Sequence, residues 1–440
     1  MKWLLFIVFS ATALAGDLAL TNGSRVVIFG DSITDAHFYS DYLATWWLTQ
    51  NPDKLLHIYV EGRGGDSWYV TATTGSIYDT THTNNARYER RAYALLGVSP
   101  AQSNFCTVMF GHNGDQTSAN FVSNAWIFST NYVIGSNSAT PVLLGTNPKD
   151  LATGGTATFQ STSTNMAYVG TVSNWPASDT IATCIPVFTN NAGNGLLGFS
   201  GDTTHPGAAG HLRLAFAIIK NLGGSSNISS VTINAANLTC TASNGASISN
   251  ITGTSRSFSF VRRVSKIPMA WDLSASNCFV ALPDSSWVPN ETLTISNLTS
   301  GTYSITEDGT NFGTYSSATL AAGINLATNT ATPDFAYRLE LLGKFRDLHG
   351  IDRTNFDRLI PHVGVSDYDS NADGEYQTSN LRGSALISAL SDEVAALLPY
   401  DTNIFNAAQP LPRTFTVTRV EQGTLAIGRK VAIGGGVNLR

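Results

Sequence analysis

Short apolar runs alternate with helix-like stretches through the first half of the chain. The runs that predict buried strands are residues 25–30, 56–60, 106–110, 141–145 and 182–188. Residues 39–48 and 208–222 predict helices, and the Gly-, Ser- and Thr-rich stretch 153–164 predicts a surface loop. Strands that alternate with helices are typical of a mostly parallel sheet covered on both faces, so we predict an α/β domain here.

The pattern changes near residue 225. Residues 228–330 are rich in Thr, Ser and Asn, and period-two runs such as 293–296 and 302–306 predict an all-β module of short strands. Farther on, the predicted elements are two helices and a late strand, at residues 335–348, 381–398 and 414–420. The predicted domains are an α/β domain, a β-rich module and a mainly helical, mixed C-terminal region, at 16–225, 226–333 and 334–440.

The N-terminus predicts an export signal. Lys2 gives a short positive region, residues 3–11 are apolar, and Ala13-Leu14-Ala15 fits the small-x-small cleavage pattern. The apolar stretch is too short to span a bilayer comfortably, and no later run reaches spanning length. The alternative is a buried N-terminal helix. We expect residues 1–15 to be a signal peptide and the protein to be secreted or periplasmic, without a membrane span.

Composition narrows the class of protein further. Of the 440 residues, 42% are hydrophobic and 10% aromatic, which is enough to bury a core and argues against a disordered chain. The charged fraction of 13% is about half the usual quarter, so the surface must be largely hydroxyl and amide. The 25 Lys and Arg residues against 31 Asp and Glu residues give no cationic stripe, so a nucleic-acid partner is not expected.

The cysteines have no spacing typical of a metal site. Cys106 and Cys184 lie in short apolar runs, which indicates buried free thiols. Cys240 and Cys278 lie in the hydroxyl-rich region, where an oxidising compartment would permit a disulfide, and the sequence leaves that pairing open.

The strongest chemical signal is Gly30-Asp31-Ser32, directly after the first predicted strand. A Ser at the carboxyl end of a parallel strand, where a helix opens, stands where such sheets bind ligands. Its oxygen would lie near helix N–H groups that favour a developing negative charge. The alternative is structural, because Ser and Asp are also preferred helix N-caps.

A second motif, Asp202-Thr-Thr-His205, precedes the last predicted helix of the α/β domain. A carboxylate three residues before a histidine can share one turn with it, so Asp202 could orient the imidazole of His205. Together with Ser32, these residues form a candidate catalytic triad in the order Ser, Asp, His.

Two loops at the same predicted sheet edge complete the arrangement. Gly62 follows the second predicted strand and could present a backbone N–H, and Asn113 follows the third and could present its side-chain amide. With the N–H of Ser32, these groups would give a tetrahedral oxyanion its hydrogen-bond donors. His37 and His112 lie nearby in the sequence and could line the site.

These four blocks, in this order, resemble the SGNH/GDSL hydrolase superfamily over roughly residues 24–222. The resemblance implies a flavodoxin-like α/β/α fold and acyl-ester hydrolysis without a cofactor. By position it implies a nucleophile, Ser32, a triad completed by His205 and Asp202, and an oxyanion hole made by Ser32, Gly62 and Asn113. Residues 290–345 also look like the β-module that some exported bacterial members carry.

The chain departs from the family pattern in both oxyanion loops. Val60 stands where the family often has Asn, and Gly114 separates Asn113 from Asp115. If the second loop is shifted, Gly65 would replace Gly62 as the donor.

Residues 369–381 fit the template of a calcium-binding loop. Oxygen ligands fall at the expected positions, with Gly374 at the sharp turn. The candidate ligands are Asp369, Asn371, Asp373, Glu375 (through its carbonyl), Gln377 and Asn380. Asn380 stands where the template has a bidentate Glu, and the alternative is an acidic Asx-turn loop without metal. If calcium binds, we expect it to hold the C-terminal helices together and to take no part in catalysis.

The sequence favours an exported serine ester hydrolase that acts on a small-molecule or polysaccharide ester. Export, a polar surface and an accessory β-module suit removal of acetyl groups from carbohydrate, an argument by analogy with the superfamily. One alternative is a lipolytic or aryl esterase. Another, from a different class, is a cell-surface glycan-binding protein with an inactive hydrolase domain. The β-module itself could bind glycan or only pack on the catalytic domain.

Overall fold

The structure, a computed structural model, describes ten stretches of the chain. They are residues 18–62, 64, 103–112, 118–136, 138–149, 156–190, 196–199, 203–281, 287–359 and 383–421. The predicted signal peptide and the predicted calcium loop lie outside these ranges and stay predictions. Among the described residues, no helix is both long enough and apolar enough to cross a membrane.

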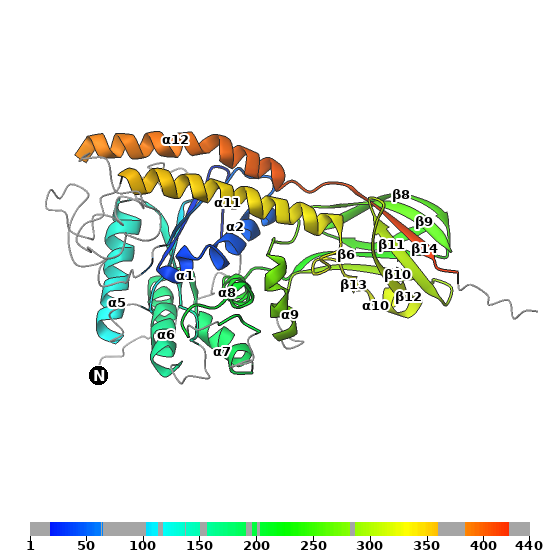
Figure 1. The fold of residues 1–440 in the computed structure, drawn as a ribbon, viewed down its shortest axis with the longest axis horizontal. Helices are drawn as coiled ribbons and strands as arrows, with labels where there is room; N and C mark the ends of the chain where they lie inside the picture. Colours follow the sequence, from blue (N-terminus) through cyan, green and yellow to red (C-terminus); the bar gives the residue numbers. More distant parts are fainter. Residues whose placement is uncertain are drawn as a thin grey trace, which may run out of the picture.

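A parallel sheet forms the core of the N-terminal half (Figure 1). Its strands run in the order β2-β1-β3-β4-β5, which is the flavodoxin-like order. Their bounds are Arg25–Gly30 (β1), His57–Gly62 (β2), Phe105–Met109 (β3), Thr140–Leu144 (β4) and Ala177–Ser178 (β5). Every residue of β3 is buried, and successive side chains point to opposite faces, so both faces of the sheet are covered. The predicted α/β class is confirmed.

Helices follow the strands as an alternating pattern requires. They are α1 (Ser32–Asp35), α2 (Tyr39–Gln50), α5 (Ser118–Ile127) with a π-helical continuation at Phe128–Ser136, α6 (Thr156–Ser173), α7 (Thr180–Asn190) and α8 (Ala208–Asn221). Helix α2 packs on α8, and α6 packs on both α5 and α7. The predicted helices at 39–48 and 208–222 are therefore present as α2 and α8.

Helix α7 contains the run 182–188, so the prediction of a strand there is wrong. Its buried side chains Ile181, Cys184 and Val187 recur at the spacing of one helix face. A short apolar run alone does not distinguish a buried strand from a buried helix face, and here the neighbouring helices α6 and α8 cover it.

Helix α6 occupies most of the stretch 153–164, so the predicted surface loop is also wrong. Ser163, Met166 and Val169 are buried along one face of this helix. The Ser163 hydroxyl donates to Asp179 Oδ1 at 2.7 Å. Ser and Thr disfavour a helix by only about 0.7 kcal/mol per residue or less, so packing of this face outweighs their propensity.

The second half of the chain forms two β-sheets packed face to face. One has the order β13-β10-β6-β7, with bounds Ile324–Asn325, Asn290–Ser296, Asn227–Asn234 and Thr239–Asn244. The other has the order β12-β11-β14-β9-β8, with bounds Thr310–Ser316, Thr302–Glu307, Arg413–Arg419, Ser257–Val264 and Ala246–Thr254. Alternate residues of β10 and β11 are buried, which is the predicted period-two pattern. The inward residues form a separate apolar core that includes Val231, Ile295, Tyr303 and Phe415.

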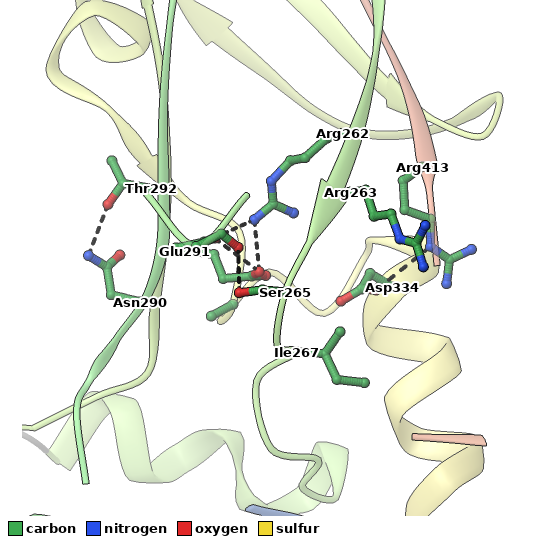
Figure 2. A network of polar contacts seen from close by, with 12 residues as sticks. Arg262, Arg263, Ser265, Ile267, Asn290, Glu291, Thr292, Asp334 and Arg413 are labelled. Atoms are coloured by element: carbon green, nitrogen blue, oxygen red, sulfur yellow. Dashed lines mark hydrogen bonds and ion pairs between the residues drawn. The ribbon is translucent and has the colours of Figure 1, made fainter. Parts of the chain in front are cut away.

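A buried ion pair joins the two sheets of this sandwich (Figure 2). Arg262 of β9 donates from Nη2 to Glu291 Oε1 of β10 at 2.8 Å and to Ser229 Oγ of β6 at 2.7 Å. Because β9 belongs to one sheet and β6 and β10 to the other, this contact fixes the sheets against each other.

Two long helices run along the α/β domain: α11 (Pro333–Leu359) leads away from the sandwich, and α12 (Gly383–Ala407) leads back toward it (Figure 1). Helix α11 packs on α2 and on α12, and α12 also contacts β2. Asp401 of α12 accepts from Tyr59 at 3.0 Å and lies 2.6 Å from His57 Nδ1. After α12, strand β14 returns to the sandwich and pairs with β11 on one side and β9 on the other. Three short elements complete the fold: a 3₁₀ turn at Leu273–Ser276, α9 (Asn277–Ala281) and α10 (Ser317–Ala322).

All four cysteines are free thiols. Cys106 and Cys184 are buried, as predicted, and burial raises the pKa of Cys106 to about 12 and of Cys184 to about 11. Cys278 is buried in α9 whereas Cys240 is exposed on β7, so the two that could have formed a disulfide do not pair.

Candidate active site

Ser32 opens helix α1 at the carboxyl end of the central strand β1. The N-cap of this helix is Asp31, whose Oδ1 accepts the N–H of Ile33 at 3.0 Å. The N-cap role, which was the structural alternative for this motif, therefore belongs to Asp31. The Ser32 hydroxyl has another partner. That position lies between β2 and β3 in the sheet, at the point where the strand order reverses and open α/β sheets bind ligands.

The partner of Ser32 is His205. Ser32 Oγ lies 2.7 Å from His205 Nε2, although the two residues are 173 apart in the sequence. This distance is within the range of a nucleophile and its general base. Ser32 is half-buried and His205 is exposed, so a substrate can reach the pair. His205 lies just before α8, in the short segment that the sequence motif places at this edge.

Gly62 lies where the sequence places it, at the end of β2 and directly opposite Gly30 of β1. A side-chain carbon added at Gly62 would collide with the backbone of Thr34 and Asp35 in α1. Beyond it, Gly64 donates its N–H to Asp35 Oδ2 at 3.2 Å. Only glycine permits this close approach of the loop to the helix that carries Ser32.

Asp202, Asn113 and the substitute donor Gly65 lie outside the described residues and stay predictions. Of the five residues predicted for the triad and the oxyanion hole, the structure thus describes Ser32, Gly62 and His205. It brings all three to the carboxyl edge of the parallel sheet.

Asn147 is a residue of this site that the sequence analysis missed. It is fully buried beyond the end of β4, and its amide donates to the carbonyl of Thr204 at 3.0 Å and to that of Pro148 at 3.0 Å. Its Oδ1 lies 2.7 Å from His112 Nε2. Because Thr204 precedes His205 and His112 precedes Asn113, Asn147 ties together the two segments that carry predicted site residues.

The proton on His112 follows from these contacts. Burial lowers the pKa of His112 to about 4, against a smaller opposing effect of its hydrogen bond to Asn147, so the ring is neutral at pH 7. The Asn147 amide nitrogen already donates to two carbonyls, which leaves its Oδ1 as an acceptor and makes His112 Nε2 the donor. A polar residue just beyond the predicted strand 141–145 is the signal that could have identified Asn147.

No protein-family model matches the sequence, and no curated protein does. Among solved structures, BT4096, described as a gut microbial diltiazem-metabolizing enzyme, matches 92% of this chain and 100% of its own, at 17% identity and a TM-score of 0.67.

Two further matches cover only about half of the chain. LAE5, an alpha/beta hydrolase enzyme from the metagenome of Lake Arreo, Spain, is 16% identical over 47% of this chain and 98% of its own, at a TM-score of 0.37. Axe2, an acetylxylan esterase from Geobacillus stearothermophilus, is 16% identical over 47% of this chain and 97% of its own, at a TM-score of 0.36. It is the match to BT4096 that shows a shared fold over nearly the whole length of this chain.

Proposed function

We propose that this protein is a serine ester hydrolase of the SGNH/GDSL type. The observation that carries the proposal is the 2.7 Å contact between Ser32 Oγ and His205 Nε2 at the carboxyl edge of a flavodoxin-like sheet. The order of the four sequence blocks supports it independently, as does the close packing of the Gly62 loop on helix α1.

The reaction begins when Ser32 Oγ attacks the ester carbonyl carbon and His205 Nε2 takes the hydroxyl proton. The carbonyl oxygen becomes an oxyanion, which accepts hydrogen bonds from the N–H of Ser32, the N–H of Gly62 and the amide of Asn113. Each such donor contributes about 10²–10³ in rate. Asp202 holds the imidazole and stabilises its cation.

Collapse of the tetrahedral intermediate breaks the bond to the alcohol, which leaves with the proton from His205. Water then attacks the acyl-enzyme in the same way, with His205 again as the base. The products are a carboxylic acid and free Ser32. No step in this sequence needs a cofactor.

The substrate we favour is a carbohydrate that bears small acyl groups, acetyl in the first instance. The predicted export signal and the hydroxyl- and amide-rich composition suit an extracellular polymer. A lipolytic or aryl esterase is the alternative within the same chemistry. The Ser32–His205 contact favours an enzyme over a glycan-binding protein with an inactive hydrolase domain.

The test is hydrolysis of p-nitrophenyl acetate and p-nitrophenyl octanoate by the wild type and by Ser32→Ala, with circular dichroism to verify folding. We expect turnover of the acetate by the wild type and none by the folded variant. Preference for the octanoate would move the substrate class to lipids. Equal rates for wild type and Ser32→Ala would contradict the assignment of Ser32 as nucleophile.

A further inference from the structure

Three metal-binding side chains meet where helix α11 packs on the start of α2. His37 lies between α1 and α2, Asp41 is in the first turn of α2, and His349 is in α11. One ligand atom from each lies within 4.8 Å of the others. We call these residues the His–Asp–His cluster. It shares no residue with the Ser32–His205 pair, and the hydrolysis proposed above does not use it.

The cluster contains buried polar atoms that lack hydrogen-bond partners among the described residues. They are Asp41 Oδ1, His37 Nδ1 and both ring nitrogens of His349. Asp41 is fully buried and His349 is 4% exposed, so water does not satisfy these atoms freely. Buried polar groups in folded proteins are almost always paired, yet these atoms have only long ion-pair contacts with one another, and His349 Nε2 has no partner among the described residues.

The spacing of these atoms fits a metal ion better than a hydrogen bond. His349 Nδ1 lies 3.3 Å from Asp41 Oδ1, and His37 Nδ1 lies 3.6 Å from the same oxygen. Zinc binds its ligands at about 2.0–2.2 Å and prefers a tetrahedral arrangement, which sets neighbouring ligand atoms about 3.3–3.6 Å apart. By contrast, the buried pair His57 and Asp401 lies at 2.6 Å, the length of a hydrogen bond.

Arg346 orients the carboxylate of the cluster. Its Nε donates to Asp41 Oδ2 at 2.8 Å, and its two terminal nitrogens bind Asp272 at 2.8 Å each. Asp41 Oδ1 is thereby left facing the two histidines, as outer-shell partners do for metal ligands. With two carboxylates and one guanidinium, the group carries a net negative charge when both histidines are neutral, and a cation would compensate it.

Two features set His37 apart from an ordinary surface histidine. His37 has a φ of 53°, a conformation that few non-glycine residues adopt, and its side chain is 23% exposed. This exposure places one edge of the cluster near the protein surface.

We infer that the His–Asp–His cluster binds one divalent transition-metal ion, zinc in the first instance, through His37 Nδ1, Asp41 Oδ1 and His349 Nδ1, with water as the fourth ligand. Two imidazoles and a carboxylate are ligands that suit zinc. The ion would link helix α11 to the segment that directly follows the nucleophile helix α1. Its role is structural, because it fixes the C-terminal helices on the catalytic domain.

The test uses the full-length, tag-free protein, stripped with chelator and kept in saturating calcium so that the predicted calcium loop does not compete. Titration with Zn²⁺ should give one tight equivalent per chain and raise the thermal midpoint, and Co²⁺ should give the visible absorption of a four-coordinate site. His349→Gln and His37→Gln should each weaken this binding at least tenfold. His57→Gln, which removes a buried histidine outside the cluster, should retain it.

Folding and binding are separated by circular dichroism on each variant. His37→Gln changes a partly exposed side chain, so it keeps the test valid if His349→Gln does not fold. The inference is wrong if the wild type takes up no equivalent of zinc, or if folded His37→Gln binds zinc as the wild type does. Neither result depends on ester hydrolysis, so the proposed function stands or fails separately.

Discussion

Replacing Asn147 by alanine should slow ester hydrolysis well beyond what the loss of stability explains. Asn147 touches neither Ser32 nor His205 in the contacts described above. It does hold the carbonyl of Thr204, next to His205, and the ring of His112, next to Asn113. The substitution should therefore loosen the proposed general base and the segment before the proposed oxyanion donor together, while Ser32 and its helix keep their place.

The magnitude follows from the contacts that are lost. Asn147 makes three hydrogen bonds, and each contributes about 0.5–1.5 kcal/mol net, so the folded state should lose about 1.5–4.5 kcal/mol. A displacement of a catalytic group by about 1 Å costs about 10²-fold in rate. We expect kcat for p-nitrophenyl acetate to fall about 100-fold, with KM changed much less.

The matched control is Asn221→Ala. Asn221, at the end of α8, also makes three side-chain hydrogen bonds, to Thr183, Ser178 and the carbonyl of Asp179. None of these partners adjoins a predicted site residue. Urea denaturation should show similar destabilisation for both variants, whereas Asn221→Ala should retain kcat within about twofold. If both variants lose the same fraction of kcat, Asn147 stabilises the fold only and our positioning argument is refuted.

Three further predictions concern other parts of the fold. Gly62→Ala should lower the free energy of unfolding by about 1–3 kcal/mol and remove most of the activity, because the added carbon collides with the backbone of α1. Gly343→Ala on α11 meets open space and should raise the free energy of unfolding by about 0.5–1 kcal/mol. Urea denaturation of both variants checks this. Burial lowers the pKa of His211 to about 3, so the unfolded chain alone takes up this proton as pH falls from about 6.5 toward 3. The free energy of unfolding should therefore fall over that window by at most about 1.4 kcal/mol per pH unit. His211→Gln should reduce this dependence on pH, which denaturation at a series of pH values measures. Asp401→Ala should cost about 1–3 kcal/mol and expose α12 to limited proteolysis, because it leaves the buried polar groups of His57 and Tyr59 without this partner; an unchanged digestion pattern would argue against this attachment.

The sequence predicted best what depends on local pattern. The strand 25–30 is a short, continuous apolar run, and the helix 39–48 is a longer stretch rich in apolar residues. Both are present within about two residues of the predicted ends. For these two elements, residues nearby in sequence carry the information. The meeting of Ser32 and His205 could also be predicted, because the order of the sequence motifs resembles that of a known hydrolase superfamily.

Features that depend on distant partners could not be predicted. Cys184 lies in an apolar run that suits a strand or a helix face, and only its packing against α8 decides between them. Asn147 has no motif, since its importance comes from Thr204 and His112, which lie far from it in sequence. The His–Asp–His cluster joins residues more than 300 positions apart, so no local spacing could indicate it.

The strand β14 shows most clearly how far the two halves of this chain depend on each other. Residues 414–420 were predicted as a late strand beyond the β-rich module, and the structure places that strand inside the module's sheet, bonded to both β9 and β11. Its inward side chains Phe415 and Val417 belong to the sandwich core. Without β14, two neighbouring strands would present open edges, which folded proteins avoid.

The chain passes along the α/β domain before it returns to the sandwich as β14. Helices α11 and α12 lie between β13 and β14 in sequence, and they pack on α2 and β2 of the α/β domain. If the β-sandwich and its two helices moved away from the α/β domain, the contacts of Arg346 with Asp41 and of Asp401 with His57 would have to break. Both contacts involve buried carboxylates. Because those contacts lie on α2 and β2, the two elements that follow helix α1 in sequence, they hold the β-module in a fixed position against the α/β domain. This arrangement favours a packing role over that of a binding module tethered by a flexible linker.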